Sequence, residues 1–215
     1  VRLEPLTRAH LDALAEVGLD PDLWIWTAST VRTRDDLAAY VETALAGQAD
    51  GTALPFATVD RASGRVVGST RFGNYVAAHR RVEIGWTFVA PPWQRTAVNT
   101  EAKLLMMAHA FDTLGLTRVE WKTDALNARS RAAILRLGAI EEGTLRSHMV
   151  VRDGRLRDTV YFSVTADEWP AVRDRLTARL AQGAFSTPIN TPGSSAGSPS
   201  PNGGVLWSQA LRCPR

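Results

Sequence analysis

A carboxylate and a polar loop lie near each other in the sequence, and together they have the chemistry of proton transfer and anion binding. Glu83 precedes the segment WQRTAVNT, residues 93–100. A carboxylate can take a proton from a reacting group. A phosphate or pyrophosphate would suit the loop, which supplies one positive charge and several hydrogen-bonding side chains, on Arg95, Thr96, Asn99 and Thr100.

The elements that hold these residues are predicted to be a strand followed by a helix. Hydrophobic residues alternate with others over residues 81–88, which is typical of a strand, and Pro91-Pro92 end it. Hydrophobic residues recur at helical spacing over residues 100–114, and Gly115 suits the end of a helix. The sequence therefore predicts that the polar loop lies at a helix start.

A helix start favours anions, because its first amides lack partners and lie at the positive end of the helix dipole. An equally good interpretation is that Thr100 or Asn99 only caps the helix. Arg95 is then a solvated surface charge. Both interpretations stay open on this segment alone.

The rest of the chain predicts one α+β domain over residues 1–182. Strand and helix patterns follow the order βααβββαβαββα. The remaining strands are expected at residues 1–6, 55–60, 65–74, 119–124, 142–150 and 157–164, and the remaining helices at residues 8–17, 34–48, 129–137 and 166–180. Residues 183–215 are rich in Ser, Pro and Gly and predict a flexible tail. Trp24 and Trp26 either pack the first two helices on the sheet or line a substrate cleft.

Composition narrows the classes of function. The 215 residues are 45% hydrophobic and contain no apolar run long enough for a membrane span. The net charge of +3 is spread along the chain, which argues against nucleic acid as a partner. The histidines show no metal-ligand spacing, so no metal is expected. Cys213 is the only cysteine and no signal peptide is visible, which favours a cytoplasmic setting.

Three segments carry a resemblance to a known family: EIGW at residues 83–86, WQRTAVNTEAK at 93–103, and NARSRAAILRLGAIEEGTLR at 127–146. Over residues 1–179 the chain resembles the GNAT N-acetyltransferases, and most of all the RimJ/RimL branch, which acetylates protein N-termini. The resemblance implies a mostly antiparallel, twisted sheet with one splayed parallel strand pair, flanked by helices. It also implies acetyl-CoA as cosubstrate.

The resemblance also implies positions for the cosubstrate. The pantetheine arm would pair with the strand backbone, and the pyrophosphate would lie on the polar loop. Asn127 matches a residue that hydrogen-bonds the pantetheine, Ser130 matches a proton donor near the thiol, and Arg131 falls in the same segment. The matching positions for the arm are Trp86, Thr87, Phe88 and Val89, and those for the pyrophosphate are Gln94, Arg95, Thr96, Ala97, Val98, Asn99 and Thr100. Ala97 and Asn99 stand where the family usually has glycine, which allows backbone to approach phosphate closely.

Acetyl transfer to an amine needs a base, and Glu83 is the first candidate. The alternative is that Glu83 forms a cross-strand ion pair with Arg71 or Arg81. For Asn127 and Ser130, the alternative is capping of the helix that follows.

RimL-type enzymes carry a catalytic glutamate in the strand after the EG turn, but this chain has Met149 there. The adjacent His148 points to the opposite face if that strand is regular.

Two functions remain open. The first is an acetyl-CoA-dependent N-acetyltransferase in which a primary amine, on a protein N-terminus or a small molecule, attacks directly in a ternary complex. The second is a catalytically degenerate CoA- or peptide-binding module with the same fold. The hairpin around Asp153 and the last helix are candidate surfaces for a homodimer.

Overall fold

The structure, a computed structural model, describes residues 1–151 and 154–183. Two sequence predictions lie outside these residues. One is the turn at Arg152 and Asp153, and the other is the tail from residue 184 onward, which includes Cys213. Within the described residues, no helix is long and apolar enough to cross a membrane.

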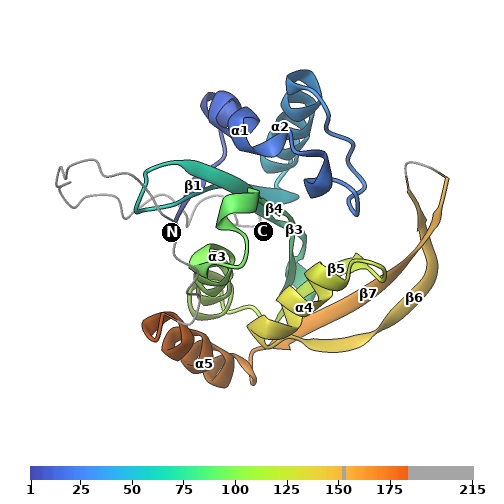
Figure 1. Ribbon diagram of the computed structural model, residues 1–215. Coiled ribbons are helices and arrows are strands. Elements are labelled where there is room, and N and C mark those ends of the chain that lie inside the picture. The colour runs from blue at the N-terminus through green and yellow to red at the C-terminus, as the bar shows by residue number, and fades with distance from the viewer. Residues whose placement is uncertain (152–153, 184–215) are drawn as a thin grey trace.

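A seven-stranded sheet forms the centre of the molecule, with the strand order β1-β2-β3-β4-β5-β7-β6 (Figure 1). Only β4 and β5 run parallel, and every other neighbouring pair is antiparallel. The predicted α+β fold is thereby confirmed. The strands are β1 (Arg2–Pro5), β2 (Ala53–Val59), β3 (Val66–Val76), β4 (Arg81–Val89), β5 (Arg118–Asp124), β6 (Ile140–Val150) and β7 (Leu156–Thr165).

Helices cover the two faces of the sheet unequally. α3 and α5 lie on one face, while α1 and α2 lie on the other, over the N-terminal strands (Figure 1). The β6–β7 hairpin extends away from these helices, at the right of the view in Figure 1. The helices are α1 (Leu11–Gly18), α2 (Arg34–Ala49), α3 (Ala97–Ala108), α4 (Ala128–Leu137) and α5 (Trp169–Ala181).

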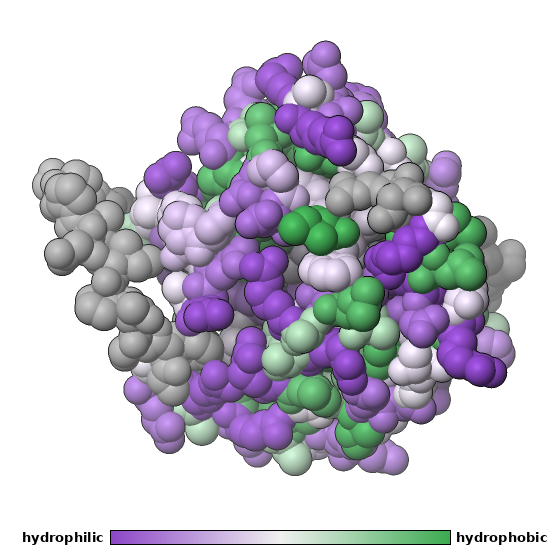
Figure 2. Space-filling model, turned by 45° about the vertical axis from the view of Figure 1, so that its right-hand side comes forward, coloured by the Kyte–Doolittle hydropathy of each residue, from purple (hydrophilic) through white to green (hydrophobic). Residues whose placement is uncertain are grey.

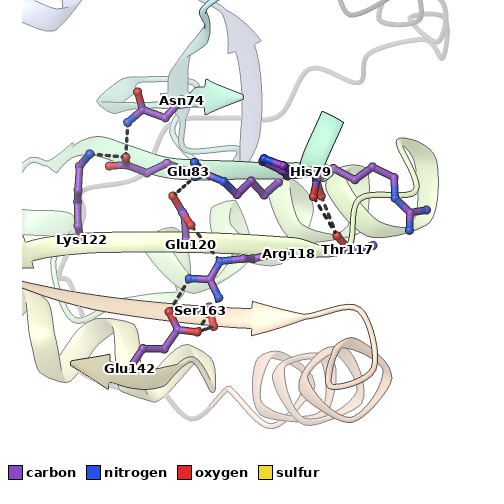
Figure 3. Close-up of polar contacts among 11 residues, drawn as sticks. Asn74, His79, Glu83, Thr117, Arg118, Glu120, Lys122, Glu142 and Ser163 are labelled. Atoms are coloured by element: carbon purple, nitrogen blue, oxygen red, sulfur yellow. Dashed lines mark hydrogen bonds and ion pairs between the residues drawn. The ribbon is translucent and has the colours of Figure 1, made fainter. Parts of the chain in front are cut away.

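Strand alternation divides the hydrophobic core into two parts. Phe56 packs in the core under α3 and α5, and its neighbour Ala57 packs in the core under α1 and α2. Successive side chains of a strand point to opposite faces, so one strand serves both cores. The part of the second face that belongs to β5, β7 and β6 bears charged and polar side chains instead, among them Arg118, Lys122 and Ser163 (Figure 3).

The ladder between β4 and β5 is short. It has three rungs, the last of which joins Glu83 to Glu120. β4 nevertheless stays paired with β3 as far as Val89, and β5 stays paired with β7 as far as Asp124. The two parallel strands therefore part after Glu83, as the splayed pair of the prediction requires.

α3 begins earlier than the sequence suggested. The expected start was Thr100, but Thr96 caps the helix, since its hydroxyl accepts a hydrogen bond from the amide of Val98 at 3.3 Å. The helix continues from Ala108 into a π turn that ends at Thr113, and Gly115 then takes the left-handed conformation expected at a helix end. Asn99 therefore lies in the first turn rather than before it.

Two other helix starts also differ from the prediction. Residues 8–10 form a 3₁₀ turn, so α1 begins at Leu11. α5 begins at Trp169 rather than residue 166, because the carboxylate of Glu168 binds the amide of Thr165 at 2.8 Å and holds a turn before the helix. The order of strands and helices is otherwise as predicted.

Candidate active site

A bulge interrupts β4 where it leaves β5. The register with β3 shifts here, and Trp86 has a φ of 48°, which is unusual for a residue with a side chain. The hydroxyl of Tyr40 donates to the carbonyl of Trp86 at 3.0 Å, and the guanidinium of Arg71 lies 5.0 Å from each of the two rings. The indole also lies directly over Gly73, where a Cβ would come within 2.5 Å of the ring. These contacts hold the bulge in place.

The loop before α3 is tied to the end of β4 and to α4. The side-chain amide of Gln94 donates to the carbonyl of Val89 at 2.8 Å and accepts from Arg129 at 3.2 Å. The hydroxyl of Thr96 donates to the carbonyl of Trp93 at 2.6 Å. Gln94 thus links the loop before α3 to the end of β4 and to α4, next to the opening between β4 and β5.

The first turn of α3 presents backbone amides at a helix start, where anions bind favourably. Its amides have no partner within the helix, and the side chain of Thr96 satisfies only that of Val98. The side chain of Val98 is buried against Ala102, so it does not reach the opening. Arg95 is exposed beside this turn.

The positive φ of this loop belongs to Arg95, at 62°, and not to Ala97 or Asn99. Those two residues lie in α3 and have ordinary helical backbone. The absence of glycine at these positions therefore does not strain the loop.

Asn127 caps α4, as one interpretation of the sequence proposed. Its Oδ1 atom accepts from the amide of Ser130 at 3.0 Å. Within the described residues, the hydroxyl of Ser130 and the side-chain Nδ2 atom of Asn127 make no hydrogen bond, so both remain available to a ligand. Arg131 is engaged elsewhere, since it donates to the carbonyl of Ala125 at 3.3 Å and to Glu141 at 3.2 Å.

Glu83 is buried and ion-paired, at the last rung before the strands part. It accepts a hydrogen bond from Asn74 at 2.6 Å and forms an ion pair with Lys122 at 2.8 Å (Figure 3). The ion pair considered from the sequence therefore exists, but its expected partners, Arg71 and Arg81, were wrong. Arg71 lies over the rings beside the bulge, and Arg81 binds a different carboxylate.

The carboxylate that Arg81 binds is that of Glu120, which belongs to a charged network next to Glu83. Glu120 accepts from Arg81 at 2.7 Å and from Arg118 at 3.0 Å, and Arg118 also binds Glu142 (Figure 3). The hydroxyl of Ser163 donates to Glu142 at 2.8 Å. The hydrogen bond from Arg118 is the main reason that the pKa of Glu142 is lowered.

A cavity of about 660 Å³ opens beside Glu83. Its walls include Asn74, Lys122 and Tyr161. Because the first two bind Glu83, the carboxylate lies next to space that water or a ligand can enter. In the view of Figure 2, polar and charged side chains cover most of the surface, with hydrophobic ones in smaller groups.

His148 lies on the cavity side of the sheet, contrary to the expectation for a regular strand. β6 has a register shift between Leu145 and Met149, and Ser147 has a φ of 49°. This irregularity lets the ring of His148 meet the edge of Tyr161, with ring centres 5.9 Å apart.

The two tryptophans of the α1–α2 connection have different roles. Trp24 is buried and packs against Tyr40 and Phe88, so the packing interpretation is confirmed for this residue. Trp26 is half-buried and lies 5.8 Å from the guanidinium of Arg155 on the β7 hairpin. It therefore contacts the hairpin between β6 and β7.

Lys103 is a residue that sequence analysis did not single out. It is 3% exposed, and its ammonium donates to the hydroxyls of Thr70 and Thr87 at 2.6 and 2.7 Å. Because burial removes water and no carboxylate replaces it, the pKa of Lys103 falls to about 7. A usable signal was its spacing from Met106 and Met107, which places it on the buried face of α3.

The geometry suits a thioester cosubstrate with a diphosphate. The unpaired edges of β4 and β5 can accept an extended chain, and the start of α3 can accept a diphosphate. Glu83 and Ser130 lie on the strand and helix that border this opening. Among the described residues, no group of three or more His, Cys, Asp or Glu side chains is arranged to hold a metal.

Comparison with known proteins agrees with this geometry. The sequence profile of the Acetyltransferase (GNAT) domain matches residues 1–140. A Bacillus subtilis protein named "Putative ribosomal N-acetyltransferase YdaF" is 32% identical over 106 residues, which cover 49% of this chain and 57% of that protein. The chain thus spans little more than half the length of this relative.

Solved structures match over more of the chain. A GCN5-related N-acetyltransferase from Brucella melitensis is 38% identical with a TM-score of 0.77, and the match covers 83% of this chain and 81% of that one. Mycobacterium smegmatis RimJ in complex with CoA-disulfide is 27% identical with a TM-score of 0.70, and the match covers 84% and 88%. The opening between β4 and β5 and these matches lead to one conclusion: the chain belongs to the GNAT acetyltransferase family.

Proposed function

We propose that this protein transfers the acetyl group of acetyl-CoA to a primary amine, by direct attack of the amine in a ternary complex. The observation that carries the proposal is the parting of β4 and β5 directly after Glu83. It leaves strand edges for the pantetheine and brings a carboxylate to the base of the opening. The amides at the start of α3, which lack partners within the helix, come after the other end of β4 and suit the diphosphate.

The residues around the opening have separate tasks in this proposal. Gln94 holds the diphosphate loop against β4, and Asn127 hydrogen-bonds the pantetheine with its side-chain Nδ2 atom. Glu83 takes a proton from the attacking amine, directly or through water in the cavity. Ser130 gives a proton to the departing thiolate.

The ion pair sets a condition on Glu83. Lys122 neutralises the carboxylate and competes with the proton that Glu83 has to accept. An incoming ammonium can replace Lys122 as the partner of Glu83 before it loses its proton. Because Lys122 lines the cavity, it has room to move.

Two kinds of acceptor fit a protein of this family. The name of the Bacillus subtilis relative refers to ribosomal acetylation, and RimJ is among the similar structures. These similarities favour a protein N-terminus, and a small-molecule amine is the other candidate. Neither acceptor needs a metal, because the attacking amine, the carboxylate and the hydroxyl supply the groups that the reaction needs.

The proposal is tested by release of CoA thiol from acetyl-CoA, with a panel of N-terminal peptides and small amines and with mass spectrometry of the products. Turnover with at least one amine, and an acetylated product, is the expected result. Binding of acetyl-CoA without product across the whole panel would support the alternative, a CoA- or peptide-binding module that has lost catalysis.

A further inference from the structure

Two side chains of β7 are buried on the cavity side of the sheet with unpartnered polar atoms. Arg157 is 7% exposed, and its Nε atom has no hydrogen-bond partner. Thr159 is 0% exposed, and its hydroxyl likewise has none. Buried polar groups are nearly always hydrogen-bonded, so two such groups at alternate positions of one strand call for an explanation.

Both side chains lie next to the proposed reaction site. Alternate residues of a strand share a face, so Arg157 and Thr159 lie on the same side as Tyr161, which lines the cavity. Thr159 pairs with Asp124 at the end of the β5–β7 ladder. The charge of Glu83 is close enough to act on the guanidinium of Arg157. The two side chains therefore lie on the same face of the sheet as the cavity, and they precede Tyr161 of its wall at alternate positions along β7.

The carboxylate of Asp124 does not satisfy Arg157. It accepts instead from Arg155 at 2.6 Å and from the amide of Leu126 at 2.9 Å. No other described residue accepts a hydrogen bond from the guanidinium of Arg157. This arginine is therefore a buried cation that lacks an anionic partner.

Electrostatics agree with this description. Burial lowers the pKa of Arg157, while the charges of Asp124 and Glu83 oppose the shift without cancelling it. Glu83 is itself engaged in the ion pair described above. A buried charge without a partner is unfavourable, and an anion bound beside it would relieve this.

The local charge indicates what kind of anion fits. Three cations, Lys122, Arg155 and Arg157, lie near two carboxylates, Glu83 and Asp124. The balance is one positive charge. A carboxylate carries one negative charge and matches it, whereas a phosphate group carries nearly two.

We propose that Arg157, assisted by Thr159, binds a carboxylate of the acetyl acceptor, so that the acceptor is an amine that also carries a carboxylate. The inference rests on the proposed acetyl transfer and specifies its substrate class. A guanidinium offers parallel N–H donors that match a carboxylate, and a threonine hydroxyl adds another donor. The carboxylate comes from a free amino acid or from an acidic residue at a peptide N-terminus.

Paired acceptors separate these two sources. The pairs are alanine with alaninamide, and peptides that begin with Glu with otherwise identical peptides that begin with Gln. We expect one acid to be acetylated with a kcat/KM at least tenfold above that of its neutral counterpart. The pair that shows the difference identifies the source.

Variants of Arg157 assign the preference to this residue. Arg157→Gln should abolish the preference by raising the KM of the acid far more than the KM of the neutral amine, and Arg157→Lys should retain part of it. Arg136→Gln, which changes an exposed arginine of α4, is the matched control and should keep the full preference. Equal use of acid and neutral acceptors by the unaltered protein would overturn the proposal.

Calorimetric binding tests the inference without catalysis. The N-acetylated forms of the same compounds are titrated into the full chain in the presence of CoA. We expect the acid to bind more tightly than the amide, and Arg157→Gln to remove the difference. Equal affinities in both pairs, or a preference that survives the substitution, would overturn the inference even if no amine is turned over.

A thermal measurement separates ligand binding from a structural role. Arg157→Met keeps most of the side-chain volume and removes the charge. Because no described residue accepts a hydrogen bond from the guanidinium, we expect Tm without ligand to stay the same or rise. A clear fall in Tm would assign Arg157 to stability rather than to acceptor binding.

Discussion

Lys122 on β5 forms an ion pair with Glu83 on β4, with its Nζ atom 2.8 Å from Oε2, and Lys122 lies two residues beyond the last backbone rung between these strands. This side-chain contact crosses the opening at its base, where the backbone ladder has already ended. The contact could have either of two roles. It could only stabilise the position of the two strands, or it could pair with Glu83, the general base of acetyl transfer, until the acceptor amine binds. The two roles predict different effects of substitution.

Glu83→Gln keeps the size of the side chain and removes its ability to take a proton. We expect kcat to fall at least tenfold, which corresponds to about 1.4 kcal/mol of activation free energy, with the KM for acetyl-CoA unchanged. Steady-state kinetics with a responding amine measure both. Glu42→Gln, at an exposed glutamate of α2, is the matched control.

Lys122→Met completes this test. If Glu83 serves only to pair with Lys122, then the two variants should lower activity and stability equally. If Glu83 is the base, then Lys122→Met should retain far more of kcat than Glu83→Gln. Equal losses would contradict the catalytic role of Glu83.

Ser130→Ala removes a hydroxyl that has no partner within the described residues. The helix cap should survive, because Asn127 binds the backbone amide of residue 130 and not its side chain. We therefore expect unchanged stability and a loss of kcat of at least tenfold. Unfolding in urea and thiol-release rates measure the two quantities, with Ser63→Ala as the control. An unchanged kcat would remove Ser130 from the mechanism.

Gln94→Ala disconnects the diphosphate loop from the end of β4. The variant loses the hydrogen bond to Val89 and the acceptor for Arg129. A hydrogen bond contributes about 1 kcal/mol, so we expect acetyl-CoA to bind about fivefold more weakly. Calorimetry measures the affinity, and the exposed Gln182→Ala serves as control. Equal affinities of the variant and the unaltered protein would show that the loop does not depend on Gln94.

Lys103 should make stability depend on pH. Its pKa is about 7 in the fold and near 10.4 in an unfolded chain. Between these two pKa values the unfolded state binds more protons than the folded state, so Lys103 makes the free energy of unfolding rise with pH. The destabilisation by Lys103 is complete below pH 7 and disappears above about pH 10.4.

Lys103→Met should remove this contribution and stabilise the protein at pH 7. The quantity to compare is the difference in free energy of unfolding between variant and unaltered protein, since other groups titrate too. We expect this difference in free energy of unfolding to decrease by about 2 kcal/mol between pH 7 and pH 9. Urea titrations at each pH measure it. A difference independent of pH would contradict the shifted pKa.

Local patterns in the sequence were sufficient for most elements of the fold. The alternation around Glu83 and the capping residue Thr33 before α2 are signals that no distant contact overrides. The start of α3 was missed because Thr96, Asn99 and Thr100 are all acceptable caps. The choice of Thr96 depends on the turn that Pro91 begins and on the left-handed backbone of Arg95.

The site was less accessible to sequence analysis, because its contacts join distant strands. The pairing of Lys122 with Glu83 depends on where the β4–β5 ladder ends, and the neighbourhood of Arg157 depends on the β5–β7 register. The position of His148 depends on a bulge that no residue pattern marks. The burial of Lys103 was visible only as a charge on an apolar helix face.

A crystal structure of the full chain with CoA tests the central claim most directly. We expect the diphosphate to contact the amides at the start of α3, near Ala97 and Asn99, and the pantetheine to lie along β4. The thiol should end between β4 and β5, within reach of Ser130 and close to Glu83. CoA bound elsewhere, or β4 and β5 closed against each other with CoA excluded, would contradict this description of the site.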